Sequence, residues 1–213
     1  MNRELLYRND LSNIDFDNIT NEYHNELNKL VDMNNKSFLE NKNITVKDYL
    51  KVIDWIFEIM YKRFTAPEYF LSLSILKKYM IDNKDIKIGY FQAYACASMI
   101  NALKIENNET FKRLERFIYE MFAKLTDNTY TAEFLKALTE KYKDIKIATT
   151  YDYLHFYNEM LWKEVKLPIN KVVDLYTDMI SLLKVIDETI TNKNSLLAYV
   201  AFKYILDENN ILS

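Results

Sequence analysis

The sequence predicts an all-α fold, and three observations carry that prediction. Glycine occurs once and proline twice in 213 residues, whereas hairpin turns and phosphate-binding loops depend on glycine. Apolar residues recur at helical spacing along most of the chain. Helix-start signals are also present: Thr45 precedes Asp48 by three residues, and Pro67 stands beside Glu68 in an expected first turn.

The expected elements follow in order. Residues 1–16 read as a weakly structured leader, and 17–33 as a first helix with apolar residues at helical spacing. A polar connector, 34–43, separates this helix from the rest. The remaining expected helices span 45–63, 67–81, 89–103, 110–125, 131–143, 150–164, 168–185 and 194–206. Helix 89–103 is rich in alanine and should lie at the centre of a bundle, because small side chains let neighbouring helices approach closely.

Composition excludes several classes of protein. A formal net charge of −3 argues against a nucleic-acid partner, which usually requires a basic face. No apolar run approaches the roughly 18 residues needed to span a membrane. Residues 1–10 carry charge and lack the apolar core of a signal peptide. We therefore expect a soluble, intracellular protein.

No catalytic constellation is visible. The two histidines, His24 and His155, lie on different expected helices with no ligand-spaced partner. Cys96 stands in the most apolar helix, where a buried, inert thiol is expected. No glycine-rich loop precedes a helix. The sequence therefore predicts neither an enzyme, nor a metal site, nor a cofactor.

Several stretches carry a family resemblance. Within 44–58, Asp54-Trp55 is followed by apolar residues and Glu58, and 92–106 ends in Ala-Leu-Lys-Ile-Glu. A Thr-Asp-Asn-Thr-Tyr-Thr turn follows at 126–131. Their order and near-gapless spacing resemble the cyclin box, and the stretches 149–154 and 194–202 are similar to parts of a second cyclin box.

The resemblance implies a cyclin-like fold of tandem five-helix boxes preceded by a helix. On this basis residues 1–43 would form the leader and its helix, 44–145 the first box, and 146–213 a second box. Only three helices are expected in the second box, so it would be short or truncated.

The resemblance also implies a function: a regulatory subunit that binds and activates a cyclin-dependent protein kinase as a heterodimer. Cyclins press on the kinase helix that carries the active-site glutamate. A lysine at the end of the third helix and a glutamate on the fifth usually anchor this contact. Lys104 matches the lysine. Ungapped counting places Thr139 at the glutamate position with Glu140 beside it, and Ile105 and Asn101 would lie near the same edge.

Many cyclins carry an apolar patch on their first helix that docks substrates. The matching positions are Asp48, Val52 and Trp55. Asp48 stands where the family has methionine and could simply cap its helix, so we expect this docking to be weakened or absent. Trp55 is more often a core residue than a docking surface.

Alternatives remain open. The chain could be a cyclin-fold scaffold that activates no kinase, or another helical bundle that captures a partner helix. An enzyme is the least favoured class, because no site can be named. For a kinase regulator we expect the nucleus, the cytoplasm or both, with no membrane partner.

Overall fold

The computed structural model describes residues 41–60, 63–106, 111–125, 130–164, 168–186 and 194–211, and every regular element in these ranges is an α-helix. The helices are α2 (Val46–Met60), α3 (Ala66–Asp82), α4 (Ile88–Ile105), α5 (Phe111–Leu125), α6 (Tyr130–Lys141), α7 (Thr150–Glu164), α8 (Ile169–Ile186) and α9 (Asn194–Glu208). The all-α prediction is confirmed. Each expected helix between 45 and 206 is present, whereas the expected helix at 17–33 lies outside the described residues.

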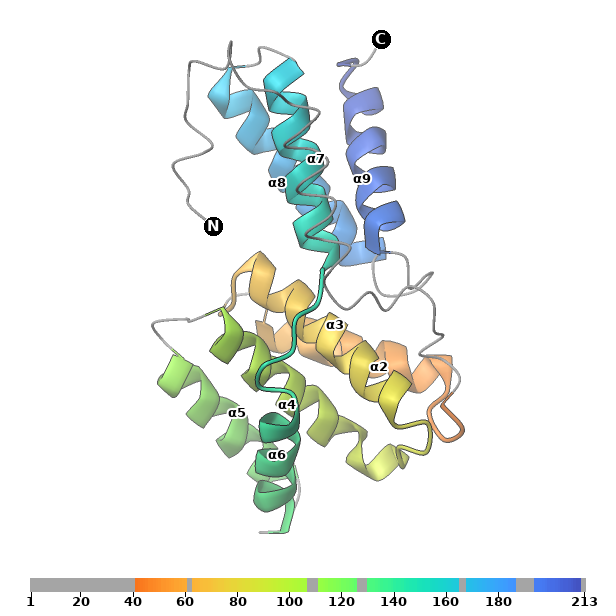
Figure 1. Ribbon diagram of the computed structural model, residues 1–213, viewed down its shortest axis with the longest axis vertical. Coiled ribbons are helices and arrows are strands. Elements are labelled where there is room, and N and C mark those ends of the chain that lie inside the picture. Colours follow the sequence, from red (N-terminus) through yellow and green to blue (C-terminus); the bar gives the residue numbers. More distant parts are fainter. Residues whose placement is uncertain are drawn as a thin grey trace.

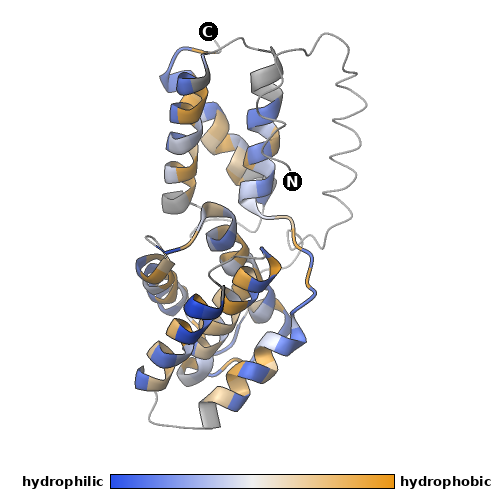
Figure 2. Cartoon of the chain, turned by 90° about the vertical axis from the view of Figure 1, so that its left-hand side faces the viewer, coloured by the Kyte–Doolittle hydropathy of each residue, from blue (hydrophilic) through white to orange (hydrophobic). Residues whose placement is uncertain are grey.

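Two groups of helices make up the described molecule (Figure 1). The first unit, α2–α6, is arranged around α4, which packs against α2, α3, α5 and α6. The second unit, α7–α9, packs α7 against both α8 and α9. Residues 142–149 connect the last helix of the first unit to the first helix of the second. Apolar and polar residues alternate along the helices, as expected when each buries one face (Figure 2).

Helix α4 lies at the centre because its side chains are small and apolar. Ala95, Cys96 and Ala97 are completely buried, and so are the larger Met99 and Ile100. The small residues let α3 pack closely along α4. The prediction of a central helix over 89–103 is therefore confirmed.

Helices α2 and α7, which open the two units, begin with the same capping arrangement. Thr45 donates its backbone N–H and its hydroxyl to Oδ2 of Asp48, at 3.1 and 2.6 Å. Thr149 makes the same two bonds to Oδ2 of Asp152, both at 2.8 Å. The aspartate N–H donates back to the threonine hydroxyl at 3.2 Å in each case. Such boxes satisfy N–H groups that a helix start leaves without partners.

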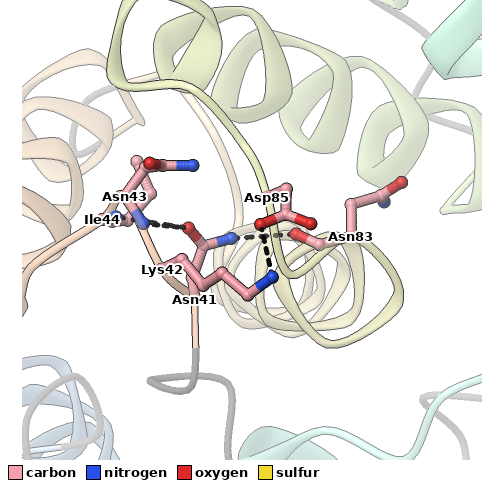
Figure 3. Close-up of polar contacts among 6 residues, drawn as sticks. All are labelled: Asn41, Lys42, Asn43, Ile44, Asn83 and Asp85. Atoms are coloured by element: carbon pink, nitrogen blue, oxygen red, sulfur yellow. Dashed lines mark hydrogen bonds and ion pairs between the residues drawn. The ribbon is translucent and has the colours of Figure 1, made fainter.

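The chain enters α2 along the turn between α3 and α4 (Figure 3). Asn41 is 8% exposed, and its Nδ2 donates to the Asn83 carbonyl at 2.8 Å. Its Oδ1 accepts the Ile44 N–H at 3.2 Å. Lys42 forms an ion pair with Asp85 at 3.2 Å, with both side chains largely exposed. The buried asparagine thus attaches the start of α2 to the far end of α3.

The two units meet where α3 packs against α7. The rings of Phe70 and Tyr151 stack with their centroids 6.3 Å apart and an interplanar angle of 22°. Phe70 is completely buried. This aromatic contact joins the start of α7 to the core of the first unit.

Candidate functional site

Lys104, the predicted kinase-contacting lysine, lies in the last turn of α4. Its side chain is 31% exposed, and its Nζ lies 3.4 Å from Oε1 of Glu115, whose side chain is 25% exposed. Helix α5 supplies this carboxylate, because it packs along α4 and turns Glu115 toward the end of that helix. The lysine is therefore partly buried and already paired, at the edge where α4 ends.

Tyr119 extends this polar edge by one turn of α5, since residues four apart lie on the same side of a helix. Burial raises the pKa of Tyr119, and the neighbouring Glu115 and Glu140 raise it further. A side-chain hydrogen bond with Thr139 of α6 acts in the opposite direction. Tyr119 is partly buried against the core, and α4, α5 and α6 pack against one another, so the three helices contribute to one edge.

The two candidate positions on α6 differ in their surroundings. Thr139 is 1% exposed, and its hydroxyl donates to the Lys136 carbonyl at 2.8 Å. Glu140 is exposed, and its carboxylate lies 3.4 Å from Nζ of Lys143 on the same helix. One residue along a helix is a rotation of about 100°. The structure therefore turns Thr139 inward and leaves Glu140 at the surface.

Asn101, which we predicted near the kinase-facing edge, is turned into the interior of the first unit. Its side chain is completely buried, and Nδ2 donates to the Tyr79 hydroxyl at 3.2 Å. The Tyr79 hydroxyl donates in turn to the Leu138 carbonyl at 3.0 Å. Asn101 lies one turn before Lys104, where α4 is still covered on all sides. Ile105, at the end of α4, is partly buried against the core and lies at the edge itself.

Comparison with known proteins decides the family. The model of the family described as "Cyclin, N-terminal domain" matches residues 17–152, which is more than half of the chain. This chain belongs to the cyclin family. No curated protein matches it, and no solved structure does. The match runs from the expected leader helix into the first turn of α7.

The three positions that match the apolar docking patch of many cyclins lie on α2. The carboxylate of Asp48 accepts two hydrogen bonds from Thr45 and caps α2. Val52 is 9% exposed and belongs to the core, and Trp55 is partly buried against that core. The expectation that substrate docking at these three positions is weakened or absent stays a prediction. The surroundings of the side chains are in keeping with it, because α2 packs against α3 and α4 and Asp48 serves as a cap.

Cys96 is buried in α4, and His155 lies beside a carboxylate on its own helix. Burial raises the pKa of the Cys96 thiol, which keeps it protonated and inert. His155 Nε2 lies 3.1 Å from Glu159 on α7, and His24 lies outside the described residues. Within the described ranges, no group of three or more His, Cys, Asp or Glu side chains could hold a metal ion. No helix there is long and apolar enough to cross a membrane.

Sequence reasoning missed Glu115 and Tyr119. The local pattern held a partial signal, because these residues are four apart on a helix whose buried side carries Leu114, Ile118 and Phe122. Their place at the margin of the buried face could be read from that periodicity. Their meeting with Lys104 could not, since it depends on how α5 packs across α4.

Proposed function

We propose that this cyclin binds and activates a cyclin-dependent protein kinase through the edge formed by the end of α4 with α5 and α6. The observation that carries the proposal is Lys104, which occupies the family's lysine position, is partly exposed, and is held beside a carboxylate. Ile105 adds an apolar surface next to it. A preformed charged group beside an apolar residue is typical of the anchor points of protein interfaces.

Activation would arise from differential binding. A regulatory subunit shifts its partner toward the active arrangement only by as much as it binds that arrangement better. In kinases, the helix that carries the active-site glutamate must lie inward for the lysine–glutamate ion pair to form. Contact of that helix with the α4–α6 edge would stabilise the inward position. The complex would be a heterodimer that acts in the nucleus, the cytoplasm or both.

The test is a pull-down from native cell extract with the full chain, followed by a kinase assay of the captured material. We expect the natural sequence to retain an active kinase and Lys104→Glu to lose at least about 90% of it, since a reversed charge at an anchor costs more than one tenfold step in affinity. Lys203→Glu on α9 is the matched control, because it makes the same change at an exposed position outside the first unit. Equal retention by both variants would contradict the proposal.

A scaffold role without kinase activation is the second candidate. Helix α9 exposes Tyr199, Val200 and Tyr204, each between 46% and 53% accessible. Exposed apolar side chains grouped on one helix are typical of surfaces that bind other proteins. A kinase that is captured but not activated, or capture of other proteins alone, would favour this candidate.

A further inference from the structure

We propose that Glu115 of α5, and not Glu140 of α6, is the acidic member of the charged pair through which this cyclin contacts its kinase, with Tyr119 as the residue that positions it. The inference rests on the proposed function. It changes the helix that supplies the acid, and it adds two residues that the family pattern does not indicate in this sequence.

The first step is the pairing of Lys104. Its Nζ lies 3.4 Å from Oε1 of Glu115, and about three quarters of the Glu115 side chain is removed from solvent. Partial burial strengthens such a pair relative to a fully exposed one, because less water screens the two charges. Both side chains keep a quarter or more of their surface exposed, so a partner can reach the charged groups at this edge.

The second step concerns α6, where the family pattern places the acid. The residue at that position is Thr139, whose buried hydroxyl donates to the Lys136 carbonyl. The adjacent Glu140 has 57% of its side chain exposed and pairs with Lys143, three residues along its own helix. An exposed pair within one helix contributes little and holds its carboxylate only loosely. Glu140 is therefore placed less well than Glu115 to act together with Lys104.

The third step is the place of Tyr119, which follows Glu115 by one turn of α5. Its side chain is partly buried and packs against the hydrophobic core. This packing holds the α5 edge at the level of the ion pair. Tyr119 is therefore a positioning residue, which holds that edge in place without needing to touch the kinase.

The experiment measures the dissociation constant of the full chain for the kinase recovered from native extract by the unsubstituted protein. We expect Glu115→Gln to weaken binding about tenfold and Glu140→Gln less than about twofold. The double variant Lys104→Gln/Glu115→Gln should bind about as weakly as Lys104→Gln alone, because residues that act as a pair are not additive. Tyr119→Ala should weaken binding about threefold, whereas Tyr119→Phe, which keeps the ring, should leave it unchanged. Glu115→Asp should recover part of the loss.

Melting temperatures of the same variants separate a change at the contact from a change in folding, since a purely structural role would lower melting temperature and affinity together. A larger effect of Glu140→Gln than of Glu115→Gln, or fully additive effects of Lys104→Gln and Glu115→Gln, would overturn this inference and leave the proposed function in place. Failure of the unsubstituted chain to retain any kinase would overturn both.

Discussion

Helices α4 and α9 each stand third in their unit, and they differ in how much of their circumference is covered. Helix α4 packs against four neighbours, and its side chains from Ala95 to Leu103 are all buried. Helix α9 packs mainly against α7 and α8, and it leaves Val200 and Tyr204 about half exposed. Both helices are strongly apolar, so composition alone does not separate them. The difference shows that α5 and α6 decide the burial of α4, and that the described second unit has no counterpart to them.

The first helices of the two units provide a second contrast. The same threonine–aspartate box caps α2 and α7, but the first lies in water and the second at the junction between the units. Hydrogen bonds from Thr45 lower the pKa of Asp48. Burial raises the pKa of Asp152, although bonds from Thr149 act against that shift. One local motif therefore has opposite electrostatic consequences in two environments.

The largest expected effect tests the contrast between α4 and α9. Ile100→Ala should reduce the free energy of unfolding by about 2–5 kcal/mol, because it leaves a cavity at a completely buried position. Val200→Ala, at a side chain 47% exposed, should change it by less than about 0.5 kcal/mol. Urea unfolding followed by circular dichroism measures both. A large reduction of the free energy of unfolding by Val200→Ala would mean that this face of α9 is covered in solution. It would contradict the difference in burial between α4 and α9.

An intermediate effect is expected at the two caps. Thr149→Ala should reduce the free energy of unfolding by about 2 kcal/mol, because it removes a cap and leaves the partly buried Asp152 carboxylate without one donor. Thr45→Ala should reduce the free energy of unfolding by about 1 kcal/mol, since water can replace the lost hydroxyl at this exposed cap. Unfolding free energies of both variants, with Thr149→Ser and Thr45→Ser as controls that keep the hydroxyl, give the measurement. Equal costs would show that the junction does not strengthen the cap.

The smallest expected effect is the opposite pH dependence of the two aspartates. The folded pKa of Asp48 lies below 3.8, so its contribution to stability is present above that pH and is lost as the pH falls through the folded pKa. The folded pKa of Asp152 lies above 3.8, so its contribution is present below that pH and is lost as the pH rises through the folded pKa.

Two amide variants measure this difference. As the pH rises from 3 to 7, the free energy of unfolding of Asp152→Asn should increase relative to that of the parent. That of Asp48→Asn should decrease relative to the parent. An amide oxygen can still accept the threonine bonds, so the slope with pH reports mainly the charge. Glu106 and His155 also act on the charge of Asp152, so the pH series should be repeated with Glu106→Gln. If the free energies of unfolding of both amide variants changed with pH in the same direction relative to the parent, the opposite pKa shifts of Asp48 and Asp152 would be contradicted.

Much of the fold could be predicted from the sequence. The helices, their order and the central place of α4 follow from apolar periodicity, small side chains and helix-start signals, all of which are local properties. The ends of the helices could not be predicted to the residue: α6 ends at Lys141, two residues before the predicted end at 143. The candidate lysine could be predicted as well, because its neighbours in sequence carry the family pattern.

The set of helices, their caps and the membership of the cyclin family follow from the amino-acid sequence without knowledge of the fold. Tertiary structure alone decided that Asn101 and Val52 are buried, that Glu115 meets Lys104, and that the charges of Asp48 and Asp152 respond to folding in opposite ways. These two sets of properties depend on interactions that act over different distances along the chain. Helical periodicity and capping act over three or four residues, whereas burial and ion pairing between helices depend on which distant segment packs against each face.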